Sequence, residues 1–450
     1  MNILHTSDWH LGRMLYGRKR YQEFAAFLDW LLELVEQQSV DVLIVAGDIF
    51  DTTTPSNKAQ SLYYRFLARL SHSCCRHVVV VGGNHDSPSF LEAPKALLQF
   101  LDIHIIGAAQ EQPEDEVLLL RDAQDQLELI VCAIPYLRDR DIRQATAGES
   151  LSEKDQKMIA GIRAHYQRTF DIAQNYQQAH HTQVPIIATG HLFTSGGQTV
   201  EGDGVRELYV GSLAQAPASI FPAELDYVAL GHLHVPQKVQ GQEHIRYSGS
   251  PIAMGFGEAK QQKSVCLVRF QSEGNEAVTD QANDNKHGNT LDLFAAPPAS
   301  NRHIELLPVP RFQALRQLRG DWAQISKQLT QIANELTETS PENTPKDGVY
   351  LEIIYDGHEH IANLKERIQA TISECIDPDR MPVLRIKNQQ LLQQTLTRQH
   401  HDERLEQLNE QQVFERCLAQ YQMSPEESQS LRESYVEIVR QVHEQDHQAE

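Results

Sequence analysis

The sequence has few cysteines, and none of them lies in a paired motif. Its 450 residues include six cysteines, all outside any Cys-x-x-Cys arrangement. Such spacing supports neither a disulfide framework nor a structural zinc site of that type. We therefore expect free, partly buried thiols.

Long apolar runs and a basic leader segment are also missing. No stretch reaches the roughly 18 apolar residues that a membrane-spanning helix needs. The chain opens directly on a strand-like segment, Met1 to Leu4, without the basic and apolar regions of a signal peptide. We expect a soluble cytoplasmic protein that has no membrane partner.

Positive charge is scarce. The chain carries 40 Lys and Arg against 61 Asp and Glu, a net charge of -21. This balance argues against a general nucleic-acid coat protein, because counterion release from phosphates requires clustered basic residues. A local basic track is still compatible with it, and the alternative is solvated surface charge. The candidates for such a track are Arg13, Arg18-Lys19-Arg20, Arg138, Arg140 and Arg143.

Several short apolar runs each lead into polar residues that bind metals. The runs predict buried strands at residues 3–4, 42–46, 78–81, 186–188 and 228–230. The clusters that follow them are Asp8-Trp9-His10, Gly47-Asp48, Gly82-Gly83-Asn84-His85-Asp86, Gly190-His191 and Gly231-His232-Leu233-His234. Because ligands of open α/β folds bind at the ends of the strands, we expect these side chains to converge at one sheet edge.

Helical periodicity separates the strands. We predict helices at residues 21–37, 56–70, 90–101 and 152–179. Strands that alternate with helices indicate a layered α/β domain. The stretch 272–302 is polar and rich in Asn, Asp and Gly. We therefore place a first domain at 1–271 and treat 272–302 as a linker or insertion.

A smaller α/β unit is expected at residues 303–388. The pattern predicts strands at 303–309, 349–355 and 383–386 and helices at 321–336 and 361–374. A Gln-rich linker and a two-helix tail follow at 389–450. Phe414 and Leu418 lie on the apolar face of the first tail helix, which either packs on this protein or docks on a helical partner. The Gln-rich linker favours a partner.

Each polar cluster alone also fits a turn or a helix cap, but the set indicates a metal site. All clusters follow strands, and the last has the form Gly-His-x-His. The donors are carboxylate, imidazole and amide groups without thiolate. Such a set suits a borderline divalent ion and is poorer for Mg²⁺. We expect Mn²⁺.

As a set, these clusters resemble the calcineurin-like metallophosphoesterase pattern. Residues 3–12 and the segment Tyr247-Ser248-Gly249-Ser250-Pro251 are similar, more narrowly, to the SbcD family of nuclease subunits from bacterial SbcCD complexes. The resemblance is strong over residues 1–270. It implies an α/β fold, namely a layered metallophosphoesterase β-sandwich flanked by helices, with a small α/β capping domain and a helical C-terminal tail.

The resemblance implies a Mn²⁺-dependent DNA nuclease that acts in replication, recombination and repair. Its activities would be a 3′-to-5′ exonuclease on double-stranded ends and an endonuclease on single strands and hairpins. The partner would be an SbcC-type ATPase held by the tail, in a heterotetramer with two copies of each subunit. No Gly-x-x-x-x-Gly-Lys-Ser/Thr motif occurs here, so ATP must be bound elsewhere. Helices 56–70 and 90–101 would form a homodimer contact, and residues 303–388 would cap the DNA.

Carried over by motif, the resemblance assigns two metal ions. One would be held by Asp8, His10, Asp48 and His234, and the other by Asp48, Asn84, His191 and His232. Asp48 would bridge them, because two neighbouring cations need a shared anion, and a water between them would become the attacking hydroxide. Neither ligand set needs His85. We assign His85 to protonating the leaving oxygen or stabilising its charge.

Asp51 departs from relatives that place a second histidine at this position. We therefore expect no second catalytic histidine. Asp51 either supports a metal-binding histidine or caps the following turn, and the adjacent Thr52 to Pro55 favour the turn.

Other functions on this scaffold also have to be weighed. A phosphoprotein phosphatase would place an arginine after the second Asp, but Asp51 is followed by Thr52-Thr53. A small-molecule phosphodiesterase or phosphatase on the same two-metal scaffold is the alternative, although it would have little use for the second unit and the tail. A non-catalytic assembly protein is disfavoured by the intact set of candidate ligands.

Overall fold

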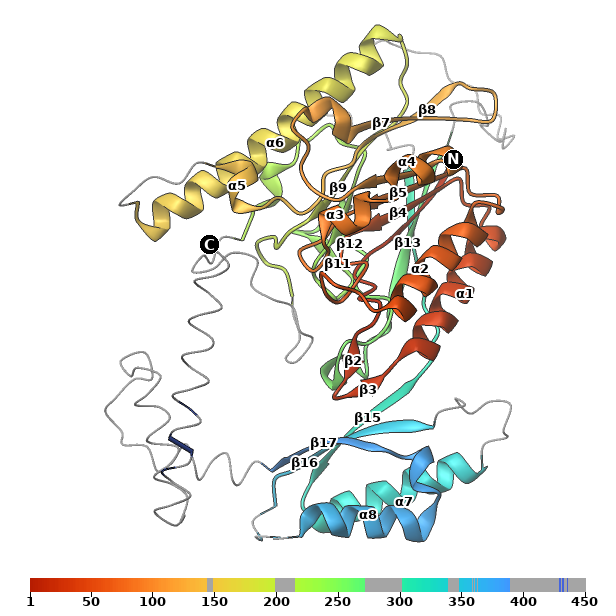
Figure 1. The fold of residues 1–450 in the computed structure, drawn as a ribbon, viewed down its shortest axis with the longest axis vertical. Coiled ribbons are helices and arrows are strands. Elements are labelled where there is room, and N and C mark those ends of the chain that lie inside the picture. Colours follow the sequence, from red (N-terminus) through yellow and green to blue (C-terminus); the bar gives the residue numbers. More distant parts are fainter. Residues whose placement is uncertain are drawn as a thin grey trace, which may run out of the picture.

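The protein is described by a computed structural model covering residues 1–143, 149–198, 215–271, 302–338, 348–357, 359, 361 and 363–388, with Gln429, Leu431, Arg432 and Tyr435. Two six-stranded sheets pack face to face and are covered on their outer faces by helices (Figure 1). A smaller sheet with two helices forms a separate layer below them (Figure 1). The arrangement agrees with the layered α/β sandwich expected from the sequence.

The first sheet carries the N-terminal part of the chain. Its strands, in spatial order, are β14 (Arg302–Pro308), β13 (Ser264–Phe270), β1 (Asn2–Thr6), β4 (Val42–Ala46), β5 (His77–Val81) and β6 (Ile103–Ile106). β1, β4, β5 and β6 are parallel, so their carboxyl ends share one edge. Helices α1 (Tyr21–Gln37) and α2 (Asn57–Leu70) bury their apolar faces against the outer side.

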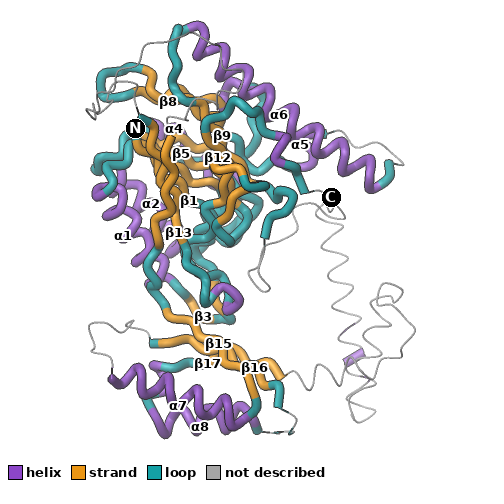
Figure 2. The backbone as a smooth tube through the Cα atoms, turned by 180° about the vertical axis from the view of Figure 1, so that it is seen from behind, coloured by secondary structure: helices purple, strands orange, loops and turns teal. Residues whose placement is uncertain are grey.

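The second sheet is built from the middle of the chain. Its strands, in spatial order, are β11 (Gln237–Val239), β12 (Gln242–Tyr247), β10 (Tyr227–Gly231), β9 (Ile186–His191), β8 (Leu127–Cys132) and β7 (Val117–Arg121). β8, β9, β10 and β12 are parallel to one another. Helix α6 (Leu151–Ala179) covers the outer face, preceded by the short α5 (Asp139–Ile142). Seen from behind, the strands lie between α1 and α2 on one side and α6 on the other (Figure 2).

An apolar core joins the two sheets. Ile3, Val42 and Val79 from the first sheet meet Ile187 and Ala229 from the second, and all five are fully buried. The central strands are buried on both faces, which explains why they are continuous apolar runs rather than alternating patterns. This rigid sandwich fixes the strand ends from which the candidate ligands project.

The smaller unit is a parallel three-stranded sheet. Its strands are β15 (Ala314–Gly320), β16 (Val349–Tyr355) and β17 (Val383–Asn388), and its helices are α7 (Trp322–Glu338) and α8 (Leu364–Cys375). Both helices lie on one face of the sheet (Figure 1). On the other face, Leu315 and Tyr350 pack on Leu15 and Phe256 of the sandwich.

A short hairpin connects this unit to the sandwich. The hairpin pairs β2 (Met14–Leu15) with β3 (Arg18–Lys19). The guanidinium of Arg18 donates to the Tyr350 hydroxyl at 3.3 Å, and Arg385 donates to the Tyr16 hydroxyl at 2.8 Å. These contacts place the small unit next to the loop that follows β1.

Two expectations from the sequence differ from the structure. The helix expected at 90–101 is broken into α3 (Pro88–Glu92), α4 (Lys95–Leu98) and a 3-10 turn, η1 (Gln99–Leu101). Pro94 accounts for the break, since it lacks the backbone N–H of a continuous helix. The strand expected to open the small unit is β14, which pairs antiparallel with β13 and extends the first sheet. The small unit therefore begins after Pro308.

No helix in the described part of the chain is long and apolar enough to cross a bilayer. The other short helical turns are η2 (Pro113–Glu116), η3 (Ala218–Ile220), η4 (Phe256–Glu258) and η5 (Pro378–Arg380). Among them, η4 matters most for the site because Glu258 ends it.

Candidate metal centre

The ends of five strands deliver the expected metal-binding side chains to one place. Asp8 and His10 follow β1, Asp48 follows β4, and Asn84 follows β5. From the second sheet, His191 ends β9, and His232 and His234 follow β10. Two groups form: one ligand atom from each of Asp8, His10 and His234 lies within 4.8 Å of the others, and the same holds for Asp48, His191 and His232. The edges of both sheets thus meet at this centre.

Asp48 connects the two groups. Its Oδ2 lies 3.3 Å from Nε2 of His191 and 3.5 Å from Nε2 of His10. Its Oδ1 accepts the backbone N–H of His85 at 2.9 Å, which fixes the carboxylate. Asn84 joins the second group, since its Oδ1 lies 3.0 Å from Nε2 of His191.

The side chains of the first group, Asp8, His10 and His234, also lie close together. The Nε2 atoms of His10 and His234 are only 3.2 Å apart. Oδ1 of Asp8 accepts the backbone N–H of His232 at 2.9 Å, and its Oδ2 accepts the Ser7 hydroxyl at 2.5 Å. Ser7 in turn contacts the hydroxyl of Ser248, so the orientation of Asp8 is set from both sheets.

The backbone at these loops is unusual. Asp8, His10, Asp48 and His232 all have positive φ angles, of 54°, 46°, 52° and 100°. Such conformations are costly for residues other than glycine and gather at functional sites. Gly83 shows how tight the packing is, because an added Cβ there would collide with the carboxylate of Asp48. The loops are therefore shaped to bring polar groups together.

Burial sets the charges of the centre. Six of the seven candidate ligands are 3% exposed or less, and only Asn84 is more accessible. Burial alone raises the pKa of Asp48, but attraction to His191 and His10 outweighs it and holds the pKa well below its usual range. Burial lowers the pKa of His191, yet Asp48 overrides this and raises it to about 9. A cation bound at Nε2 of His191 would therefore replace a proton.

Two other rings are held neutral. Burial lowers the pKa of His10, against the opposing influence of Asp51 and Asp48. Burial and the neighbouring His191 hold the pKa of His232 well below its usual value. Neutral imidazole is the form that binds metals. The donors, which are carboxylate, imidazole and amide groups close together and buried, fit a pair of divalent ions.

His85 sits at the edge of the first group. Its ring centre is 4.8 Å from that of His10, with the rings perpendicular, and it is 5% exposed. Its Nδ1 lies 2.8 Å from the carbonyl oxygen of Asp51. Because a carbonyl only accepts, Nδ1 carries the hydrogen, and Nε2 is the atom left for another group.

Asp51 lies beside a candidate histidine ligand, which is the role that its sequence context favoured less. Its Oδ1 lies 3.5 Å from Nδ1 of His10 and 3.3 Å from Nη1 of Arg13. The carboxylate therefore supports a candidate ligand rather than serving only the turn. A histidine ligand that contacts a carboxylate through its other nitrogen is oriented and made more basic.

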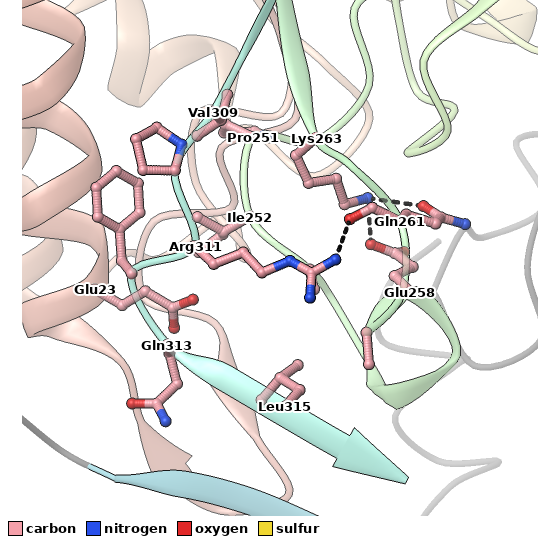
Figure 3. Close-up of a pocket in the computed structure, with 14 residues that line it drawn as sticks. Glu23, Pro251, Ile252, Glu258, Gln261, Lys263, Val309, Arg311, Gln313 and Leu315 are labelled. Carbon is pink, nitrogen blue, oxygen red and sulfur yellow. Dashed lines mark hydrogen bonds and ion pairs between the residues drawn. The ribbon is translucent and has the colours of Figure 1, made fainter. Parts of the chain in front are cut away.

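Sequence reasoning missed a second supporting carboxylate, Glu258. It is 1% exposed, and its Oε1 lies 3.6 Å from Nδ1 of His234. Its Oε2 pairs with the buried ammonium of Lys263 at 2.5 Å (Figure 3). Burial raises the pKa of Glu258, but His234 and Lys263 outweigh it and lower the pKa to about 2. Lys263 also donates to the carbonyl oxygen of His234 at 3.0 Å.

Asp86 ends the cluster Gly82-Gly83-Asn84-His85-Asp86, and its side chain joins two loops of the site. Its carboxylate accepts the backbone N–H groups of Ile49, Phe50 and Gly83. It thereby ties the loop after β4 to the loop after β5. Burial, helped by the charge of Asp48, raises the pKa of Asp86 to about 7.

Some residues of the expected basic track pair with acidic side chains of the protein, and others are accessible to other molecules. Arg20 is 3% exposed and pairs with Glu23 at 2.6 Å. Arg143 pairs with Asp139 and Glu149. Lys19 and the 76% exposed side chain of Arg140 remain accessible. The expected partner-binding residues Phe414 and Leu418 lie outside the described residues.

Comparisons with known proteins agree with this site. The family described as calcineurin-like phosphoesterase matches residues 1–236, and the family described as type 5 capsule protein repressor C-terminal domain matches residues 311–422. The chain is 36% identical to SbcD, the D component of the SbcCD nuclease, from Escherichia coli strain K12 over 432 residues, which is 96% of each chain.

Two further relatives are named in the same way. The Rhodobacter capsulatus protein is 36% identical over 274 residues, 60% of this chain and 66% of the relative. The Bacillus subtilis protein is 37% identical over 271 residues, again 60% of this chain and 66% of the relative. All seven candidate ligands lie within the residues matched by the phosphoesterase family.

Proposed function

Since the chain belongs to the SbcD family of calcineurin-like metallophosphoesterases, we propose that it is a metal-dependent DNA nuclease that works with an SbcC-type ATPase. The observation that carries this proposal is the buried centre around Asp48, where carboxylate, imidazole and amide groups converge from both sheets. The relatives are named as nuclease components, and the similarity to the Escherichia coli protein extends through 96% of the chain. The whole architecture, rather than the site alone, supports the assignment.

We assign two metal ions to the centre. Asp8, His10 and His234 would hold one, Asn84, His191 and His232 would hold the other, and Asp48 would contact both. The support is geometric, because Oδ2 of Asp48 lies 3.3 Å from His191 and 3.5 Å from His10. Of the divalent ions, Mn²⁺ suits this mixture of nitrogen and oxygen donors better than Mg²⁺. When bound, such a pair activates water at neutral pH and neutralises charge on a phosphate.

The chain's own groups complete the chemistry. Asp48 supplies the shared negative charge, and its backbone contact with His85 holds it in place. Glu258 and Asp51 orient His234 and His10 from behind. His85, which the ligand sets do not need, would present Nε2 to a bound phosphodiester, and with a hydrogen on both ring nitrogens it would donate the Nε2 proton to the leaving oxygen. General-acid help of this kind is worth about 10²- to 10⁴-fold in rate.

The proposed substrates are DNA ends and hairpins. We infer a 3′-to-5′ exonuclease on double strands and an endonuclease on single strands and hairpins, in replication, recombination and repair. The small unit supports this reading because it packs on the hairpin that follows the loop after β1 and on Phe256, and from there it would cap a bound duplex. Such a nuclease would act in the cytoplasm, where its DNA is found.

Partners follow from the exposed surfaces and the tail. We propose a homodimer through α2 and the segment 88–101, because Leu97, Phe100 and Leu101 are 69%, 89% and 44% exposed. Isolated monomers seldom leave such neighbouring apolar side chains in water. Two such chains with two ATPase chains would form the heterotetramer, with Phe414 and Leu418 in the tail contacting the ATPase.

The test is a comparison of substrates. The purified protein is given a labelled DNA hairpin, a linear duplex and a small generic phosphodiester in Mn²⁺, each with and without the ATPase partner and ATP. The proposal expects hairpin cleavage, with cutting of duplex ends that depends on the ATPase. Turnover of the small phosphodiester without DNA cleavage under any condition would favour the alternative, a small-molecule phosphodiesterase or phosphatase.

A further inference from the structure

A second group of metal-binding side chains lies away from Asp48. His77 begins β5, Asp102 precedes β6, and His104 is the second residue of β6. One ligand atom from each lies within 4.8 Å of the other two. β5 and β6 pair in parallel with Val79 opposite His104, so the group sits where these strands begin. The nuclease centre lies beyond their opposite ends, and β5 alone spans roughly 13 Å.

One ring nitrogen of His77 bonds to the backbone, and the other has no partner. Its Nε2 lies 2.7 Å from the carbonyl oxygen of Arg121 in β7. The carbonyl only accepts, so Nε2 carries the hydrogen and Nδ1 keeps a free lone pair in the neutral ring. Nδ1 is buried and has no hydrogen-bond partner, and the residue is 9% exposed. Metal-binding histidines characteristically donate their other N–H to a backbone carbonyl.

His104 also has a ring nitrogen that lacks a hydrogen-bond partner. Its Nε2 is buried without a hydrogen-bond partner. Burial and the neighbouring His77 lower its pKa, so the ring is neutral at neutral pH. The two ring centres are 6.0 Å apart. Both rings thus carry a buried nitrogen without a partner, which costs free energy because buried polar atoms are nearly always paired.

Asp102 adds the charge that a cation requires. Its carboxylate is exposed, and its backbone has a φ of 54° at the turn into β6. A cavity of about 330 Å³ is lined by His104 together with Lys95, Gln99, Gln110 and Asp115 among others, so His104 can be approached from this cavity. Lys95 brings a positive charge to this lining, and Asp115 offsets it.

We propose that His77, Asp102 and His104 bind a Zn²⁺ ion. Two imidazoles and one carboxylate are a frequent zinc donor set, with bonds of about 2.0–2.2 Å and a fourth position left to water. Manganese would prefer more oxygen donors than this group offers. Because His77 also bonds to β7, the ion would join the starts of β5 and β6 to the second sheet. The site would therefore stabilise the sandwich rather than take part in cleavage.

The test counts bound zinc. Untagged full-length protein is stripped with a chelator, saturated with Mn²⁺, dialysed against low-micromolar Zn²⁺ and analysed for both metals. Asp102→Asn is the first variant because asparagine tolerates the same backbone conformation and removes only the charge. His104→Gln is the second, and Asp48→Asn is the control for zinc at the nuclease centre.

We expect both variants to hold one zinc fewer per chain than the wild type, while Asp48→Asn keeps that zinc. Zinc should raise the melting temperature of the Mn²⁺-saturated wild type and of Asp48→Asn but not of the two variants. Mn²⁺-dependent cleavage by Asp102→Asn should equal that of the wild type, which shows that the variant is folded. Equal zinc content in the wild type and both variants would overturn the proposal.

Discussion

Nδ1 of His234 faces Oε1 of Glu258 at 3.6 Å, and the other oxygen of Glu258 pairs with Lys263. All three groups are buried. The candidate ligands thus have charged groups behind them, because the Glu258–Lys263 pair lies next to the ring of His234. Removal of a carboxylate that supports a metal-binding histidine typically weakens metal affinity by about 10- to 100-fold.

Glu258→Gln should weaken activation by Mn²⁺. We predict that the Mn²⁺ concentration giving half-maximal cleavage rises about 10- to 100-fold, because His234 loses the carboxylate that orients it. The rate at saturating Mn²⁺ should largely recover. Glu243→Gln, at an exposed carboxylate paired with Arg246, is the control and should leave the curve unchanged. A rate that stays low at every Mn²⁺ concentration would indicate loss of folded protein instead.

His85→Gln should slow the chemical step without loss of metal. The side chain contacts the backbone of Asp51 and is not among the proposed ligands. We expect cleavage to fall by about 10²- to 10⁴-fold, with unchanged Mn²⁺ content and unchanged DNA binding. Single-turnover cleavage and metal analysis on the same preparation provide the measurement. Full activity at saturating Mn²⁺ would remove His85 from the chemistry.

His5 should make folding sensitive to acid. Its ring is fully buried, and burial lowers its pKa to about 3. The unfolded chain takes up this proton near pH 6.5, whereas the folded chain does not until about pH 3. Stability is therefore lost as the pH falls below 6.5, by about 1.4 kcal/mol per pH unit from this group.

The substitution His5→Phe removes that dependence. Urea unfolding at several pH values should show a free energy of unfolding that falls less steeply below pH 6.5 than in the wild type. The phenyl ring keeps the packing on Tyr227 but loses the hydrogen bond of 2.9 Å to its hydroxyl, so the variant should be less stable at neutral pH. The exposed His303 provides the control, as His303→Gln. Parallel curves for His5→Phe and wild type would refute the assignment.

Phe100→Glu should separate the proposed homodimer. Phe100 is 89% exposed and has Leu97 and Leu101 as neighbours on the same short segment. A charge there cannot be buried in an apolar contact without a large cost. We expect light scattering to report half the wild-type mass, with Mn²⁺-dependent cleavage of a short hairpin retained. Leu306→Glu, at another exposed leucine, should leave the mass unchanged.

The sequence predicted long, periodic elements well and local breaks poorly. The helix expected at 21–37 is α1, and the strand expected at 42–46 is β4. Both have strong apolar patterns that tertiary contacts only reinforce. The helix expected at 90–101 is interrupted at Pro94, and whether a proline breaks a helix depends on the turn around it. Strand β15 was missed because its Arg and Gln residues interrupt the apolar pattern.

The candidate ligands could be predicted because they follow strands whose ends must meet at one edge. Their supporting groups could not. Glu258 is 24 positions beyond His234, in a turn whose path no local pattern fixes. For Asp51 the sequence left both roles open and favoured the turn, since no local pattern places this residue behind His10. His77 and His104 were missed for the same reason, because only the pairing of β5 with β6 brings them together.

Cleavage of a labelled DNA hairpin by the wild type and by Asp48→Asn, in Mn²⁺ and in EDTA, tests the central claim most directly. Asp48 contacts both groups of candidate ligands, so its replacement by the neutral asparagine should disable the whole centre. The account predicts cutting by the wild type in Mn²⁺, none in EDTA, and none by a folded Asp48→Asn. Cutting that persists in EDTA or in Asp48→Asn would contradict a metal-dependent nuclease built around this carboxylate.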